Sequence, residues 1–375
     1  HHVTGAGDRV AGARVLVLIA GLAIAALGTL AGIAVILAAL LGPQSQAMVM
    51  VTFGFSLLLL CAGLGSALAW TAWQSIQGQR SQPFEPRRVW VLVALFFLAL
   101  AVGQLILQVE ALPLLTFPPL HVAAAVLPPV TVLAWVGRSL GRRTRQRDAV
   151  LQLGSGAFVS TTLAITLEGI AVLGVILAVL AALALQPGGL QQIQDLAQQM
   201  QSESAGAQAW MENPEELVSL LRSPVVVGAA FLIVVILVPL IEEATKAIGI
   251  VLRWYRRPNL SQAFLWGLAG GAGFALVEGL FNSLGGLDVW VLAVFARVGA
   301  SLLHCFNGAL MGIAWYSILA QRRWLRGTGL YALAVGVHGL WNALSVGMAF
   351  LSLDTLTGDP AAANGGLTGA GMFVL

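Results

Sequence analysis

Apolar residues form nine long runs along the chain, separated by shorter polar segments. Each run supplies about the 20 residues that a helix needs to cross a bilayer, and a spanning helix satisfies its own backbone hydrogen bonds. The pattern predicts an all-α, polytopic helical membrane protein with about nine transmembrane spans. The expected spans are about 13–41, 47–76, 89–109, 116–137, 157–186, 224–252, 260–283, 289–320 and 327–350.

The fourth expected span differs from the others in its proline content. Proline lacks a backbone N–H and bends or ends a helix. We therefore expect 116–137 to be kinked, or to form a re-entrant segment. The prolines in or just before it are Pro113, Pro118, Pro119, Pro128 and Pro129.

The composition agrees with a membrane protein. Hydrophobic residues make up 58% of the chain and charged residues only 9%, whereas soluble domains carry about 25% charge. The mean hydropathy is +0.89. These values exclude an ordinary soluble enzyme, a disordered chain and a basic-patch nucleic-acid binder. The lipid bilayer is the expected environment, and no nucleic-acid partner is expected.

The few basic residues predict how the chain crosses the membrane. Sixteen of the 19 lie in alternate connecting segments, whereas the intervening segments carry acids such as those of 195–216. Because basic loops remain cytoplasmic, we expect a cytoplasmic N-terminus and an outside C-terminus, which an odd number of spans requires. These residues are Arg9, Arg14, Arg80, Arg87, Arg88, Arg138, Arg142, Arg143, Arg145, Arg147, Arg253, Arg256, Arg257, Arg322, Arg323 and Arg326.

Four regions are expected along the chain. The arginine-rich loop 138–147 separates four spans from five, and a long outer segment, 187–223, can form an amphipathic interfacial helix or a solvated surface helix. The Gly- and Ala-rich end is expected to be loose. The regions are 1–150, four spans without an assigned role; 151–223, the fifth span and outer loop; 224–350, a four-span core; and 351–375, the tail.

Ionisable side chains inside spans are costly, by at least about 2.5 kcal/mol each, and therefore mark functional sites. All but one of the eight singled out here lie in the last four spans, and they include the chain's only lysine. We infer that the last four spans carry a site. The residues are Glu168, Glu242, Glu243, Lys246, Glu278, Arg297, His304 and His338.

The spacing of the carboxylates suggests both pairing and chemistry. Glu242 and Lys246 are four residues apart, so they can pair on one helix face, with Glu243 beside them. Such a pair can also be structural. Glu278 can likewise belong to a site, or simply neutralise Arg297.

The two histidines lie on neighbouring spans. His304 is near the middle of the eighth, and His338 is about 18 Å past Arg326 at 1.5 Å per residue. Asn342 follows His338 on the same helix face. Two histidines beside carboxylate-bearing spans favour a site over isolated packing residues.

These motifs resemble the PrsW family of intramembrane proteases, which is related to the CAAX prenyl endoproteases and the bacteriocin-processing membrane proteases. The family pattern is Glu-Glu-x-x-Lys, Phe-x-x-x-Glu, a later histidine, and His-x-x-x-Asn or -Asp on successive spans. Here these motifs begin at Glu242, Phe274, His304 and His338. The CAAX group has histidine at the position of Glu278, so this chain is more similar to PrsW. The resemblance covers about 224–345.

The resemblance implies an intramembrane endopeptidase that cuts single-span or otherwise membrane-anchored proteins, an anti-sigma-factor-like regulator being one candidate. The implied location is the cytoplasmic membrane of a bacterium or archaeon, and 224–350 becomes the catalytic core. The implied catalytic residues are Glu242, Glu243, Glu278, His304, His338 and Asn342, and the supporting residues are Lys246, Phe274 and Arg297.

Peptide hydrolysis needs an activated water and a stabilised oxyanion. Glu242 or Glu243 is expected to take the proton, and Asn342, with one histidine, to stabilise the oxyanion. In one version, His304, His338 and either Glu278 or Glu243 hold zinc and leave one position for water. In the other, the glutamates act without metal. The chain lacks the His-Glu-x-x-His signature of many zinc proteases, so both versions stay open.

Two other functions fit an intramembrane cluster of charges. An ion- or proton-coupled transporter would use the cluster as a path, but no paired halves or inverted repeat are evident in the sequence. A non-catalytic membrane scaffold would bind single-span proteins and retain that binding after every glutamate substitution. Glycine-rich span faces permit self-association but predict no oligomeric state.

Overall fold

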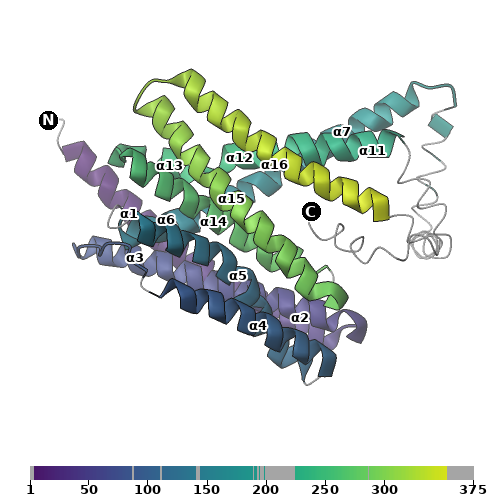
Figure 1. Cartoon of the computed structure of the whole chain (residues 1–375), viewed down its shortest axis with the longest axis horizontal. Helices are drawn as coiled ribbons and strands as arrows, with labels where there is room; N and C mark the ends of the chain where they lie inside the picture. Colours follow the sequence, from purple (N-terminus) through teal and green to yellow (C-terminus); the bar gives the residue numbers. More distant parts are fainter. Residues whose placement is uncertain are drawn as a thin grey trace. The chain divides into compact units, whose positions relative to one another are not determined.

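The computed structural model describes residues 4–86, 88–109, 112–140, 144–188, 190–191, 194, 198, 224–285 and 287–352. Across these residues it is all-α, without a strand, and nine helices are long and apolar enough to cross a membrane (Figure 1). The prediction of a nine-span helical membrane protein is confirmed. Most of the outer segment 187–223 and nearly all of the tail 351–375 lie outside the described residues.

Each expected span corresponds to one helix or to a continuous series of helical segments. Three spans contain a π-helical turn, which is rare and is often found near functional sites. The segments, in span order, are α1 (Thr4–Leu41); α2 (Gln44–Leu60), η1 (Cys61–Gly65) and α3 (Ser66–Ile76); α4 (Val89–Val109); α5 (Pro113–Ser139); α6 (Gln146–Gly154), η2 (Ser155–Ser160) and α7 (Thr161–Ala184); α11 (Pro224–Ala230), η3 (Phe231–Leu237), α12 (Val238–Lys246) and α13 (Ile248–Leu252); α14 (Leu260–Asn282); α15 (Trp290–Leu319); and α16 (Trp324–Ser352).

The proline-rich fourth span is one continuous helix. α5 extends over 27 residues and carries two adjacent proline pairs in its interior, Pro118–Pro119 and Pro128–Pro129. Its length suits a complete crossing of the bilayer rather than a re-entrant half-span. Proline-containing helices persist in membrane proteins where neighbouring groups compensate for the lost hydrogen bonds.

Contacts divide the chain into two compact units. The first unit consists of His1–Thr162 and Glu243–Ala334, and the second of Leu163–Glu242 and Val335–Leu375. The boundaries fall inside α7, α12 and α16, so each of these helices contributes to both units. The four regions expected from the sequence, with boundaries at 150, 223 and 350, remain a prediction.

α14 is the central helix of the first unit. It is the most buried of the nine spans and packs against α15, α5, α6 and η2. Glycines on both α14 and α15 make the contact between them possible, because a Cβ added to Gly271 of α14 would overlap the carbonyl oxygen of His304, and one added to Gly308 of α15 would overlap that of Gly267. The missing side chains let α14 and α15 approach closely, which brings the backbone at His304 against α14.

A third intramembrane histidine, His121 on α5, is a packing residue that the sequence analysis missed. Its side chain is fully buried, and its Nε2–H donates to the carbonyl oxygen of Leu280 at 2.9 Å. Trp290 donates from Nε1 to its Nδ1 at 3.1 Å. Both ring nitrogens are therefore satisfied, and the imidazole joins α5 to α14 and α15.

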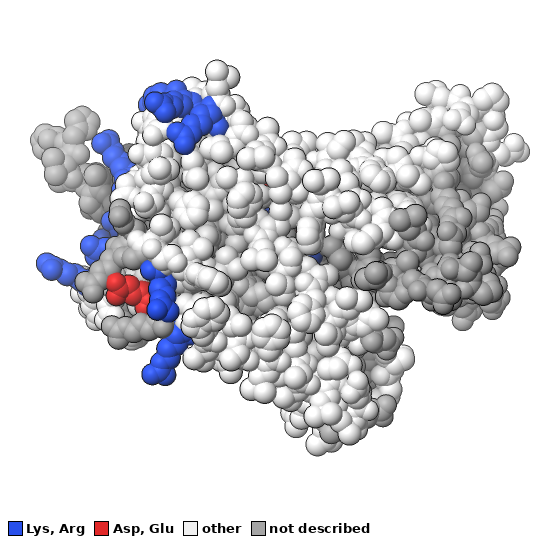
Figure 2. Space-filling view, in the orientation of Figure 1, with Lys and Arg blue, Asp and Glu red and all other residues white. Residues whose placement is uncertain are grey.

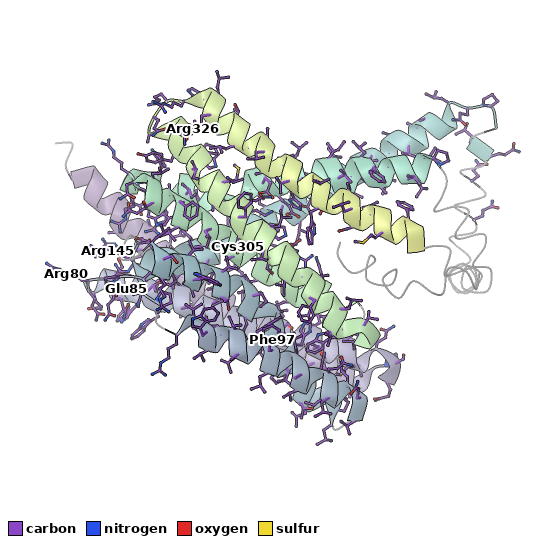
Figure 3. All side chains as sticks on the ribbon, viewed as in Figure 1. Arg80, Glu85, Phe97, Arg145, Cys305 and Arg326 are labelled. Atoms are coloured by element: carbon purple, nitrogen blue, oxygen red, sulfur yellow. The ribbon has the colours of Figure 1, made fainter. Side chains whose placement is uncertain are left out.

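Basic side chains gather at one end of the first unit (Figure 2). Arg80, Arg145 and Arg326 lie there, whereas Cys305 lies in the interior of the unit (Figure 3). This arrangement is what the positive-inside rule requires of a cytoplasmic end. The orientation of the termini across the membrane stays a prediction.

Candidate functional site

The carboxylate of Glu243 is held in one orientation inside the first unit. Glu243 lies on α12 and is completely buried. Lys246 Nζ is 2.7 Å from its Oε1, and Asn307 on α15 donates from Nδ2 to the same oxygen at 3.1 Å. Asn307 Nδ2 also donates to the carbonyl oxygen of Ala334 at 3.0 Å. The carboxylate is thereby fixed by donors from two helices.

The partner of Lys246 differs from the one suggested by spacing. The sequence suggested Glu242, four residues away, whereas the structure forms the ion pair with Glu243, three residues away. Both spacings bring side chains together on a helix, so the surroundings decide between them. The ammonium group lies 4.7 Å from the centre of the Phe274 ring, a cation–π contact that directs it toward α14.

The second group in this unit is a carboxylate shared by an arginine and a histidine. Glu278 Oε2 lies 2.8 Å from Arg297 Nη2 and 2.5 Å from His304 Nε2. Phe274 flanks the imidazole, with ring centres 5.4 Å apart. Glu278 therefore neutralises Arg297, and it also orients His304.

The Glu278–His304 pair has the form found in metal sites. A histidine that binds a metal usually donates its other ring N–H to a carboxylate, which fixes the tautomer and the ring orientation. With Nε2 directed at Glu278, Nδ1 is the ring nitrogen of His304 that can bind a metal or a water.

The second unit contributes a glutamate, a histidine and an asparagine. Glu242 Oε2 lies 3.8 Å from His338 Nδ1, and both residues are buried. Asn342 donates from Nδ2 to the carbonyl oxygen of Val234 at 2.9 Å. Val234 belongs to the π-helical turn η3, against which α16 packs closely at Gly339. The His-x-x-x-Asn motif is therefore anchored to the segment that precedes the two glutamates.

The structure thus divides the predicted site residues between the two units. The predicted site residues in the second unit are Glu242, His338 and Asn342. The boundary between the units falls between the adjacent residues Glu242 and Glu243. Asn307 was missed as a site residue, although its position in a span three residues after His304 was a usable signal. The predicted residues in the first unit are Glu243, Lys246, Phe274, Glu278, Arg297 and His304.

A comparison with protein families identifies the chain. The model described as PrsW family intramembrane metalloprotease matches residues 147–358, more than half of the sequence. The chain belongs to this family. Comparisons with curated proteins and with solved structures gave no match.

As a PrsW family member, the chain is an integral membrane protein and an intramembrane protease whose substrates are membrane-embedded proteins. Membership in this family favours a protease function over that of an ion-coupled transporter or a non-catalytic scaffold.

The matched region is longer than the motifs suggested. It begins at Arg147, near the start of α6, and so includes the fifth span as well as the last four. A Cβ added to Gly156 in η2 would overlap the carbonyl oxygen of Gly270. The fifth span, inside the matched region, therefore packs closely against α14.

The buried donors of each unit are of the types that bind a metal ion. Glu243 and His304 in the first unit, and Glu242 and His338 in the second, are all buried, and each can supply a carboxylate oxygen or an imidazole nitrogen. These are the donors that catalytic zinc sites use together with a water. The donor set therefore agrees with the description of the family as metalloproteases.

Proposed function

We propose that the enzyme hydrolyses a peptide bond of a single-span or otherwise membrane-anchored protein, using a water molecule activated by a glutamate. The observation that carries this proposal is the pair formed by the partly buried Glu278 and the buried His304, in which the carboxylate orients the imidazole. Burying such groups in a membrane is costly, and holding them in one geometry is what hydrolysis requires.

Glu242 is the general base in this proposal. Lys246 and Asn307 fix the carboxylate of Glu243 through Oε1, which suits a residue that orients water or binds a metal. Glu242 instead lies 3.8 Å from an imidazole nitrogen of His338. Glu242 takes a proton from the attacking water and passes it to the leaving amine nitrogen, so the proton lost by water ends on the product.

Asn342 stabilises the oxyanion. The amide of asparagine has two N–H groups, and one of them donates to Val234. This bond fixes the amide plane, so the second N–H is preorganised for the oxygen of the tetrahedral intermediate. Preorganised donors of this kind contribute about 3 kcal/mol to transition-state stabilisation.

His304 through Nδ1, His338 and one carboxylate would hold a zinc ion. Glu243 suits the carboxylate position better than Glu278, because Glu278 contacts Nε2 of His304, which is not the ring nitrogen proposed to hold the metal. Bound zinc would polarise the scissile carbonyl and acidify a coordinated water. The chain's own residues set the position and orientation of that water.

Removing the metal is expected to stop cleavage. We expect the purified enzyme, reconstituted in vesicles with a single-span substrate, to contain about one zinc per chain by elemental analysis. A zinc chelator should abolish cleavage and added zinc should restore it, whereas His304→Ala should lose both the metal and the activity. Full activity of enzyme shown to be metal-free would contradict the metal assignment but not the hydrolysis.

The physiological substrate is proposed to be a regulator with one span, of the anti-sigma-factor type, in a bacterial or archaeal cytoplasmic membrane. The family supports a membrane-embedded protein as substrate. Co-expression with candidate single-span proteins, comparing the wild type with His304→Ala, identifies which of them is cut.

A further inference from the structure

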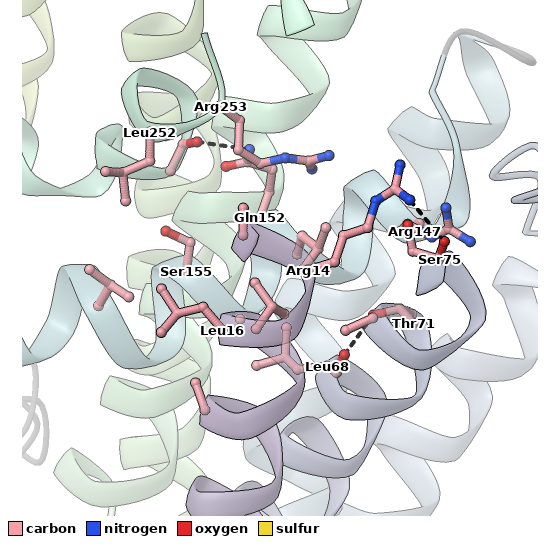
Figure 4. Close-up of a pocket in the computed structure, with 18 of the residues that line it drawn as sticks. Arg14, Leu16, Leu68, Thr71, Ser75, Arg147, Gln152, Ser155, Leu252 and Arg253 are labelled. Atoms are coloured by element: carbon pink, nitrogen blue, oxygen red, sulfur yellow. Dashed lines mark hydrogen bonds between the residues drawn. The ribbon is translucent and has the colours of Figure 1, made fainter. Parts of the chain in front are cut away.

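An apolar cavity in the first unit is lined by several arginines and by none of the glutamates or histidines of the candidate site (Figure 4). Its volume is about 390 Å³, and its walls come from α1, α3, α6, η2 and α13. Most of the lining is hydrocarbon. Apolar residues of the lining include Leu16, Val17, Ile24, Leu68, Leu151 and Phe158.

Arginines line one end of this cavity. In Figure 4 the guanidinium groups of Arg14, Arg147 and Arg253 lie toward one end, and Leu16 and Leu68 lie below them in the view. The fourth arginine of the lining, Arg256, also lies within electrostatic range of Arg147.

The charge of these arginines is poorly balanced by acids. Asp148 lies 2.6 Å from Arg253 and is the one carboxylate among the described residues that line this cavity or the polar cavity beside it. Arg14 and Arg147 donate instead to backbone carbonyl oxygens, of Ser75 at 3.2 Å and Gln79 at 3.0 Å. A net positive charge remains, which would attract an anion.

The neighbouring polar cavity has a volume of about 400 Å³ and shares Arg147 and Arg256 with the apolar one. Its other polar residues include Gln79, Arg80, Ser81, Arg145 and Gln262. An apolar cavity and a polar, arginine-rich cavity thus adjoin at two shared arginines. This is the arrangement expected for a ligand with a hydrocarbon tail and an anionic head.

We propose that the two cavities bind an anionic phospholipid. An acyl chain lies along the apolar cavity, and the phosphate sits between Arg14, Arg147 and Arg256. Basic pockets between spans at the cytoplasmic face are suited to such headgroups. A free phosphate ion would leave the apolar cavity unfilled, and an acidic peptide would place polar backbone in it. The charge and the hydrocarbon lining together favour the lipid.

Native mass spectrometry of the full-length detergent-purified protein tests this proposal. Dioleoyl phosphatidylglycerol and dioleoyl phosphatidylcholine are titrated separately, and the anionic lipid is expected to bind at least about tenfold more tightly. The double variant Arg14→Gln/Arg256→Gln should weaken phosphatidylglycerol binding by about 30-fold, because each arginine contributes about fivefold toward an anionic lipid. Its binding of phosphatidylcholine should not change.

The matched control is Arg323→Gln/Arg326→Gln, which removes the same charge at exposed positions that line neither cavity. It should leave both affinities unchanged. Equal binding of the two lipids, or an equal loss in the control, would overturn the proposal. So would displacement of phosphatidylglycerol by millimolar inorganic phosphate or by an acidic peptide. Because binding is measured without cleavage, these outcomes are independent of the proposed catalytic mechanism.

Discussion

Replacing Glu242 by glutamine is expected to lower kcat/KM for cleavage of a single-span substrate by about 10³-fold, which is within the usual contribution of general acid–base catalysis. Glutamine has nearly the same shape but cannot accept the proton of water. Glu242 is buried beside His338, so the substitution removes a charge without opening the structure to solvent. Cleavage is measured in vesicles that contain the enzyme and the substrate.

Glu168→Gln is the matched control for this variant. It makes the same chemical change in another span, on α7, and Glu168 has no part in the proposed reaction. We expect its cleavage rate to stay within about twofold of the wild type, as for a substitution away from the chemistry. If Glu242→Gln cleaved at the wild-type rate, Glu242 would not be the base.

The largest effect on stability is expected for Lys246→Met. Both side chains of the Lys246–Glu243 pair have no exposed surface, so the substitution leaves a buried carboxylate without its cation. Removing one partner of a buried ion pair costs about 3–5 kcal/mol in the free energy of unfolding. Denaturation of the detergent-solubilised protein, followed by tryptophan fluorescence, measures the change.

The double variant Glu243→Gln/Lys246→Met separates charge from packing. Because it removes both charges, we expect it to recover most of the lost free energy of unfolding while cleavage stays low. Arg326→Met, which removes an exposed charge, should change the free energy of unfolding by less than about 0.5 kcal/mol. A Lys246→Met protein as stable as that control would show that the pair is not buried in the folded state.

The sequence was sufficient to predict the nine spans because hydropathy is a local property. It also singled out the residues that are proposed to bear the chemistry, since a charge inside a span is conspicuous whatever it contacts. The side chains that these charged residues contact were less predictable. Spacing alone could not decide whether Lys246 pairs with Glu242 or Glu243, because that depends on Asn307 and Phe274, which reach the pair from other helices.

Irregular backbone and interhelical packing were also beyond prediction. Asn342 bonds to Val234 inside a π-helical turn, and an apolar run carries no sign of where such a turn lies. His121 could not be assigned before its partners, Leu280 and Trp290, were known. In both cases the decisive contact joins residues more than 100 positions apart.

The origin of the oxygen in the new carboxyl terminus tests the central claim most directly. The wild-type enzyme and a single-span substrate are reconstituted in vesicles and incubated in water that carries heavy oxygen, and the product is examined by mass spectrometry. Hydrolysis by an activated water predicts one heavy oxygen in the new carboxylate, and product formation about 10³-fold slower with Glu242→Gln. A product that lacks the label, or the same labelled product at the same rate from the variant, would contradict the account.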